Sequence, residues 1–287
     1  MVKISKVIVF FLAINLASCG KSNVNFANLK SDKKLFVIFD EMQYVHKPDL
    51  TDSGLHPLNL VYESRLISTD SNAGKQLVPD SAKIKAVAQA SIGQPLVPVT
   101  LDIESWKYWP AALPSTIDKL TQVVNIFKSV NPAAHIGYYG VIPNNKGQWS
   151  NIEPVGSQNY LQWQQLNDQL KPVGDAVDIL FPAAYTFSDD TIAWKNYAAA
   201  VVAEARRSQP NKPVFVYIWP QYHNGTPLGL QFVDAAAWRS ELETLYALAD
   251  GCVIWSGNKG VNGYINWDPN FPFWQETKAF IAEHQLK

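Results

Sequence analysis

The sequence predicts an α/β fold, built as a single TIM-like (β/α) barrel. Short apolar runs alternate with helix-length segments over about 250 residues, and no stretch has the composition of an interdomain linker. The runs are continuously apolar, which is typical of parallel strands buried on both faces. Seven runs are visible, so the barrel either has seven strands or includes one that the pattern does not show. The alternative, an open doubly wound sheet, is disfavoured because no glycine-rich phosphate loop follows an early strand.

The expected elements follow one another at regular spacing. From residue 96 onward the runs start about 40 residues apart, the length of a strand, a helix and their loops. Asp190 and Asp234 are placed to cap the N-termini of two helices. The expected strands are residues 35–39, 58–62, 96–101, 135–141, 177–181, 213–218 and 252–255. The expected helices are residues 115–130, 157–170, 190–209, 234–249 and 271–285.

The N-terminus has the pattern of a targeting segment. Two lysines precede an apolar run at residues 7–12, which is too short for a transmembrane helix of about 20 apolar residues. Residues 16–19, Leu-Ala-Ser-Cys, resemble the bacterial lipobox, in which cleavage leaves a lipidated cysteine at the new N-terminus. We therefore expect a lipoprotein signal peptide at residues 1–18 and lipidation of Cys19. An ordinary secretory signal with an incidental cysteine is the alternative.

The rest of the chain divides into a short polar stretch and one large domain. Residues 19–33 are rich in Asn, Lys and Ser, and we expect them to be a flexible tether. Residues 34–287 are expected to form the barrel. This organisation predicts a protein of the bacterial cell envelope, anchored by lipid to the outer membrane or the cell surface.

Composition and charge exclude several function classes. With 24 Lys and Arg against 25 Asp and Glu, the formal net charge is −1, and the chain has no basic stripe for nucleic acid. The five histidines lack the spacing of a metal site, and we expect neither a metal nor another cofactor. Aromatic residues make up 12% of the chain, so these rings either fill the core or line a surface for a flat apolar ligand face.

Carboxylates and aromatic rings gather where the expected strands end. Active sites of such barrels are built at the carboxyl ends of the strands. Pyranose rings present apolar faces to aromatic side chains, and carboxylates supply acid–base chemistry at the glycosidic oxygen. The strand ends therefore predict a sugar site, whose candidate residues are Asp40, Glu41, Asp102, Glu104, Trp106, Tyr138, Tyr139, Tyr185, Trp219, Tyr222 and Trp255.

Asp102 and Glu104 are the centre of this prediction. Because they stand two residues apart on a strand, their side chains are expected to point to the same side. Two like charges held close together disfavour joint ionisation, so we expect the pKa of one carboxyl to rise into the range of a general acid. An ordinary acidic loop after a strand is the alternative interpretation.

Other candidates also have structural interpretations. Tyr138 and Tyr139 alternate in face, so one is expected to pack outside the barrel while the other points into the site. Trp106 is either a sugar platform or a loop anchor. For Asp40 and Glu41, an ion pair or a helix N-terminus is favoured over a role in catalysis.

The motifs, in their order along the chain, resemble the hyaluronidase family of glycoside hydrolases. Residues 101–106, Leu-Asp-Ile-Glu-Ser-Trp, are similar to the acid motif of that family. The resemblance spans residues 35–255 and implies a distorted, seven-stranded barrel. The other matching stretches are residues 135–143, 167–170, 180–185, 213–217 and 251–255.

The resemblance implies an endo-acting hydrolase that cleaves an N-acetylhexosamine-containing glycan by a retaining, substrate-assisted mechanism. Glu104 would act as the acid and then the base, and Asp102 would hold the acetamido group of the substrate. Tyr139 and Tyr185 would bond around that group, and Trp255 would form the wall of the site. The disulfides of the family are missing here, and its first strand does not normally end in Asp-Glu.

Two other function classes stay open at this point. One is a non-catalytic carbohydrate-binding lipoprotein that has kept the sugar cleft, and the other is a structural lipoprotein of the envelope. The intact Asp102 and Glu104 argue against the first class, and the aromatic strand ends argue against the second. We expect a polysaccharide or oligosaccharide as partner, and a membrane through the lipid.

Overall fold

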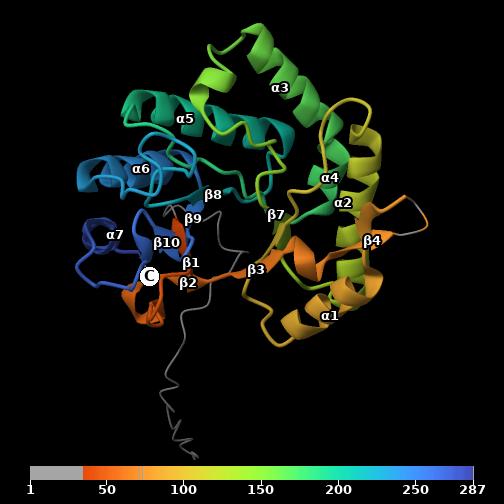
Figure 1. The fold of residues 1–287 in the computed structure, drawn as a ribbon, viewed down its shortest axis with the longest axis horizontal. Coiled ribbons are helices and arrows are strands. Elements are labelled where there is room, and N and C mark those ends of the chain that lie inside the picture. Colours follow the sequence, from red (N-terminus) through yellow and green to blue (C-terminus); the bar gives the residue numbers. More distant parts are fainter. Residues whose placement is uncertain (1–34, 71, 73, 287) are drawn as a thin grey trace, which may run out of the picture.

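The computed structural model describes residues 35–70, 72 and 74–286. Strands lie toward the centre of the molecule and helices lie around the periphery (Figure 1). This arrangement confirms the predicted α/β class. The predicted signal peptide, the lipidation site Cys19 and the predicted tether fall outside the described residues.

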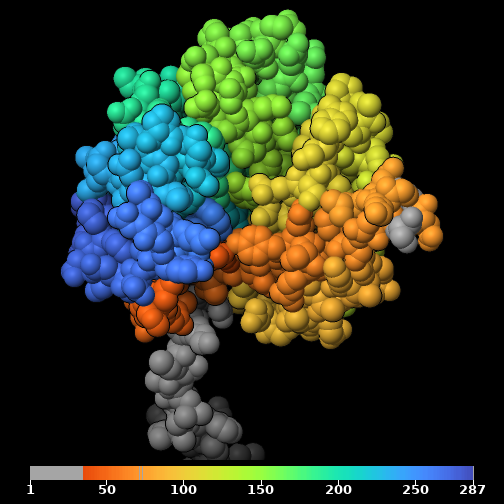
Figure 2. All heavy atoms as spheres, in the orientation of Figure 1, coloured from red at the N-terminus to blue at the C-terminus, as the bar shows by residue number. Residues whose placement is uncertain are grey.

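The central strands form parallel sheets. They are β1 (Val37–Met42), β2 (His56–Pro57), β3 (Asn59–Tyr62), β6 (Val99–Asp102), β7 (Ile136–Tyr138), β8 (Phe215–Ile218) and β9 (Gly251–Ser256). One sheet has the order β2-β1-β9-β8 and the other the order β3-β6-β7. Because β1 pairs with β9, the first and last parts of the described chain lie side by side, as the red-orange and blue regions of Figure 2 show.

Residues 56–62 join the two sheets along one side. At the start of this segment His56 pairs with Phe39 of β1, and near its end Val61 pairs with Leu101 of β6. Leu58 alone separates β2 from β3, so one nearly continuous stretch of chain serves both sheets.

On the opposite side the sheets are linked by isolated bridges. Phe181 pairs with Tyr139, and Ala183 pairs with Tyr217. The prediction of a regular strand at residues 177–181 is therefore wrong, although this segment runs between β7 and β8. Pro182 has no N–H to donate to a ladder, which interrupts the hydrogen bonding at this point.

The helices confirm most of the predicted segments. Asp190 accepts hydrogen bonds from Ile192 and Ala193, and Asp234 accepts one from Ala237, so both predicted caps are present. The sequence reading missed α1 and α4. None of the helices in the described part of the chain is long and apolar enough to cross a bilayer. Their bounds are α1 (Ser81–Ser91), α2 (Leu113–Val130), α3 (Gln158–Gln169), α4 (Lys171–Ala176), α5 (Thr191–Ser208), α6 (Ala235–Leu248) and α7 (Pro272–Glu283).

Short elements decorate the loops. The antiparallel hairpin of β4 and β5 follows β3, and a smaller one of β10 and β11 follows β9. Neither hairpin was predicted. The bounds are β4 (Ile67–Asp70), β5 (Gln76–Pro79), β10 (Lys259–Gly260), β11 (Gly263–Tyr264), and the 3₁₀ helices η2 (Thr51–Ser53), η3 (Glu63–Arg65) and η4 (Trp149–Asn151).

The side chains of the strands pack into two separate hydrophobic cores. The smaller, inner core lies among the strands and consists of Val37, Phe39, Ile179, Phe181, Ala183, Phe215, Tyr217 and Val253. The larger core fills the space between strands and helices and takes the alternate positions, such as Ile38, Val216 and Cys252. This alternation decides which residues at the strand ends face inward. Glu41, Trp219 and Trp255 each stand two residues after an inner-core residue of β1, β8 or β9. We therefore say that they are in the inward phase, because every second side chain of a strand faces the inner core.

Candidate active site

A cavity of about 400 Å³ lies at the carboxyl ends of the strands. It is bordered by residues from six separate segments of the chain, and its walls are mostly aromatic and carboxylic. The lining residues are Tyr62, Glu63, Asp102, Glu104, Tyr139, Tyr185, Tyr217, Trp219, His223 and Trp255. Of the predicted site residues, the structure thus brings together Asp102, Glu104, Tyr139, Tyr185, Trp219 and Trp255.

Asp102 is the half-buried carboxyl of the cavity. It ends β6 in the inward phase, and one of its oxygens, Oδ1, is buried without a hydrogen-bond partner among the described residues. Burial raises the pKa of Asp102 to about 7, and the nearby charges of Glu104 and Glu63 add to the rise. The predicted rise of one carboxyl pKa is therefore present. It falls on Asp102, which is close to half-protonated at neutral pH.

Glu104 lies two residues beyond Asp102, on the loop that leaves β6, and it is exposed. The carboxylate of Glu63 holds this loop in place. Glu63 Oε2 accepts hydrogen bonds from the backbone N–H groups of Glu104 and Ser105 at 3.1 and 3.0 Å. Glu63 Oε1 accepts a third from the Ser105 hydroxyl at 2.5 Å. The backbone that carries Glu104 is thus fixed from the end of the neighbouring strand.

A pair of tyrosines borders the carboxylates. The hydroxyls of Tyr185 and Tyr139 are hydrogen-bonded to each other, and the centres of their rings lie 6.0 Å apart. Burial raises the pKa of both phenols above the ordinary value, so both remain protonated donors. Both hydroxyls therefore offer hydrogen-bonding groups beside the carboxylates, and both residues line the cavity.

Two tryptophan rings continue the aromatic lining from Tyr185. Trp255 stacks on Tyr185 with ring centres 5.7 Å apart, and Trp219 meets Trp255 edge-on at 4.9 Å. Trp255 Nε1 donates to the Tyr62 hydroxyl at 3.5 Å, which ties this wall to the end of β3. Such a surface offers flat apolar faces beside polar edges, as a pyranose requires.

Five predicted site residues do not line the cavity. Tyr138 is the tyrosine that packs outward: its hydroxyl donates to the carbonyl of Leu120 on α2 at 2.8 Å. The prediction that Tyr138 contacts substrate is therefore corrected, because Tyr139 takes the inward phase. Trp106 is a loop anchor, since it is 5% exposed and its Nε1 donates to the Leu77 carbonyl of β5 at 3.2 Å.

Tyr222 and Asp40 are corrected in the same way. Tyr222 is buried in the outer core beside α6, so its ring does not reach the cavity. Asp40 lies in the outward phase of β1 and forms an ion pair with Lys47 at 2.5 Å. The structural interpretation of Asp40 is therefore supported.

Glu41 faces inward, unlike its neighbour Asp40. It is paired across the sheet with Trp255, and it influences the pKa of Tyr217, a cavity residue. Burial raises the pKa of Glu41 to about 8, with a further contribution from the charge of Asp40. Glu41 is thus an uncharged acid below this pH, beside the cavity rather than among its lining residues.

Sequence reasoning missed Tyr62, Glu63, Tyr217 and His223. The end of the strand at residues 58–62 carries Tyr62 and Glu63, so the strand-end rule would have found both. Tyr217 precedes Trp219 by two residues and shares its inward phase. No sequence signal pointed to His223, which stacks on Phe187 at a ring distance of 4.3 Å.

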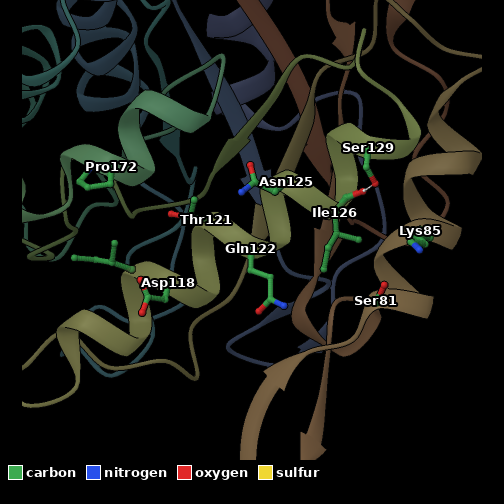
Figure 3. A pocket seen from close by; sticks show the side chains of 10 residues that line it. Ser81, Lys85, Asp118, Thr121, Gln122, Asn125, Ile126, Ser129 and Pro172 are labelled. Carbon is green, nitrogen blue, oxygen red and sulfur yellow. Dashed lines mark hydrogen bonds between the residues drawn. The ribbon is translucent and has the colours of Figure 1, made fainter.

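A further hollow of about 660 Å³ lies on the outer side, between α1, α2 and α4 (Figure 3). Its lining is mainly polar side chains of α2, such as Asp118, Gln122 and Asn125. Because it lies on the helix layer and not at the strand ends, we do not assign it the chemistry of the site. No group of three or more metal-ligating side chains occurs among the residues that the structure describes.

Solved structures with a similar fold include glycoside hydrolases. Bee venom hyaluronidase superposes with a TM-score of 0.55 and 14% identity, covering 86% of this chain and 97% of that chain. The complex of that enzyme with a hyaluronic acid tetramer superposes with a TM-score of 0.55 at 16% identity, covering 88% of this chain and 96% of that chain. An endo-1,4-beta-D-mannanase from Thermotoga petrophila gives a TM-score of 0.49 at 14% identity, covering 71% of this chain and 65% of that chain. The similarity to bee venom hyaluronidase shows that the chain has a TIM-like fold. No family model matches the sequence, and no curated protein matches it.

Proposed function

We propose that this protein is a glycoside hydrolase that cleaves N-acetylhexosamine-containing glycans by a retaining, substrate-assisted mechanism. One observation carries the proposal. Asp102 and Glu104 meet in an aromatic-walled cavity at the strand ends, and one of these carboxyls has its pKa raised to about 7. A carboxyl pair and stacking rings are what the hydrolysis of a sugar bond needs.

In the proposed mechanism, Glu104 donates its proton to the glycosidic oxygen as the bond to the anomeric carbon breaks. The acetamido oxygen of the substrate attacks that carbon and forms a cyclic intermediate. Glu104, now a carboxylate, takes a proton from water, which opens the ring with retained configuration. The exposure of Glu104 suits this exchange of protons with a bound substrate and water.

Asp102 supports the acetamido group. Its carboxylate accepts the N–H of that group and stabilises the positive charge that develops on the intermediate. The unpartnered oxygen of Asp102 is available for this hydrogen bond. Tyr139 donates toward the same group, while Trp255 and Trp219 pack against the sugar face.

A comparison of two substrates tests the mechanism. An N-acetylated oligosaccharide should be cleaved with retention at the anomeric carbon, whereas its de-N-acetylated counterpart should bind without cleavage, because it lacks the nucleophile. Product configuration is measured by NMR during the first turnovers. Efficient cleavage of the deacetylated sugar, or inversion, would contradict substrate assistance.

We also propose that lipid on Cys19 holds the protein at the bacterial envelope. The support is the sequence pattern of residues 16–19. Cys19→Ser should release the protein from the membrane fraction while leaving its thermal unfolding unchanged, because the change lies outside the barrel domain expected at residues 34–287. Equal membrane association of the variant and the parent would contradict anchoring.

Finally, we propose that the strands close into a seven-membered ring. The support is that residues 56–62 pair with both β1 and β6, while the segment around Phe181 bridges β7 and β8. The backbone N–H of Leu60 also bonds to Glu41 across the junction. A crystal structure with a break between β1 and β3 would contradict closure.

A further inference from the structure

A second cavity adjoins the candidate site. Its volume is about 220 Å³, and Tyr185 lines both cavities. The stacked rings of Phe187 and His223 stand between them, since Phe187 lines the second cavity and His223 lines the first. The half-buried Trp149, from the loop after β7, is a further ring of the second cavity. A hollow of this size, with aromatic walls, suits a single sugar ring beside the one that reacts.

The charges around the two cavities have one sign. Glu63, Asp102 and Glu104 line the first cavity. Glu153 and Asp190 line the second. Among the residues that the structure describes, no Lys or Arg lines either cavity.

The carboxylates of the second cavity differ in how they are held. Asp190 caps α5 by accepting hydrogen bonds from the backbone N–H groups of Ile192 and Ala193 at 3.0 and 2.9 Å, both on its Oδ1 atom. Glu153 is exposed and lines the second cavity, so its side chain is accessible to an incoming sugar. Lys146 stands on the same loop but lines neither cavity.

We infer that the second cavity is a neighbouring subsite that takes an uncharged or amine-bearing sugar and disfavours a uronate. The substrate class that follows is a glycan whose adjacent residues are both hexosamines, rather than one that alternates hexosamine with uronate. The inference rests on the proposed hydrolase function, because it extends the same site. A uronate placed beside Glu153 and Asp190 would meet like charge with no cation to neutralise it.

Binding measurements on the full chain test the inference. Glu104→Gln protein is titrated with a chitin hexasaccharide, its de-N-acetylated counterpart and a hyaluronan hexasaccharide at low and high salt. Chitin oligomer should bind at least about tenfold more tightly than hyaluronan oligomer at low salt. High salt should strengthen the binding of hyaluronan, because it screens the repulsion between uronate and the carboxylates of the cavities. It should weaken the binding of the de-N-acetylated oligomer, because it screens the attraction between amine and carboxylate. Equal or tighter binding of hyaluronan, or no binding of any of the three, would overturn the inference.

Two charge reversals locate the effect. Glu153→Lys should reduce the ratio of the chitin and hyaluronan binding affinities about threefold, because it places a cation in the second cavity. Asp118→Lys makes the same change of net charge in the outer hollow of Figure 3, and should leave this ratio of affinities unchanged. An equal reduction by both variants would assign the preference to overall charge and contradict the subsite.

Turnover by the unmodified chain separates this inference from the function it rests on. If no glycan is cleaved but the binding preference holds, the hydrolase proposal fails and the subsite stands. If hyaluronan is cleaved as fast as the chitin oligomer, the subsite inference fails and the hydrolase proposal stands.

Discussion

The carboxyl groups of Glu204 and Asp102 both have buried oxygen atoms, but they differ in the hydrogen-bond donors around them. Glu204 on α5 is 1% exposed, and both of its oxygens are saturated with donors. Arg207 donates to each oxygen at 2.7 Å, Gln164 donates to one at 2.9 Å, and Asn167 donates to the other at 3.0 Å. Asp102 at the strand ends has a buried oxygen with no donor among the described residues.

The two acids differ in the hydrogen-bond donors around them and in their position relative to the cavity. A buried carboxylate that serves the fold is surrounded by donors, because an unpaired charge in the interior costs several kcal/mol. Asp102 lacks such donors, has its pKa raised to about 7 and lines the cavity, so we propose that its partner is the substrate.

The largest effect is expected for Glu104→Gln. The amide keeps the size of the side chain but cannot donate and then recover a proton, so turnover should fall by about 10²–10⁴-fold. Because Glu104 is exposed and its side chain supports no packing, the unfolding temperature should stay the same. Steady-state kinetics and thermal unfolding measure the two quantities. Turnover within a few-fold of the parent would remove Glu104 from the catalytic role.

Asp102→Asn should separate activity from stability. Turnover should fall about 10²-fold, because the amide lacks the charge that supports the acetamido group. The folded pKa of about 7 lies above the ordinary value of 3.8, so ionisation of Asp102 opposes folding. The parent should therefore lose stability as pH rises from about 4 to about 7, and the variant should lack this loss.

Chemical unfolding across this pH range measures the difference between the two proteins. The same titration sets the acid limb of activity in the parent near pH 7, since Asp102 must be a carboxylate to accept the acetamido N–H. A variant that is less stable than the parent at pH 8 would break the contrast with Glu204.

Glu204→Ala should show the opposite pattern. Removing this carboxylate takes away an acceptor of Asn167 and Gln164 and one of the two acidic partners of Arg207, which keeps its ion pair with Asp168. We expect a loss of about 2–3 kcal/mol in unfolding free energy, discounted because Arg207 is partly exposed. Protein that remains folded should keep the kcat of the parent. A large fall in kcat with unchanged stability would contradict a purely structural role.

The smallest effects are expected from two neighbouring tyrosines. Tyr139→Phe should reduce turnover about tenfold, because it removes a donor to the substrate and the hydrogen-bond partner of Tyr185. Tyr138→Phe should leave turnover unchanged and cost about 1 kcal/mol of stability, through its lost bond to Leu120. Each variant is the control for the other. Reversed results would mean that the phase of the strand has been misassigned.

Much of the fold could be predicted because apolar runs and helix caps are local signals. The segment at residues 177–181 was predicted as a regular strand, but its pairing depends on neighbours, and Pro182 interrupts it. Alternation predicted that Tyr138 and Tyr139 face opposite ways. The sequence could not say which of the two faces inward, because that phase is set by pairing with β6.

Within the site, the carboxylates and rings at strand ends were predictable from one rule. Asp40 and Trp106 satisfied the same rule and were misplaced, because an ion pair with Lys47 and packing against β5 are tertiary facts. The stretch at residues 167–170 has a structural explanation: Asn167 also accepts from the backbone N–H of Asn144, which ties α3 to the loop after β7.

The hold of Glu63 on the backbone of Glu104 has a consequence for how the molecule assembles. The two residues are 41 positions apart, and the contact requires β3 to be already paired with β6 in parallel. Parallel pairing of this kind is non-local and forms slowly during folding. A chain that has not yet completed this pairing therefore lacks the contact that orders the loop carrying Glu104.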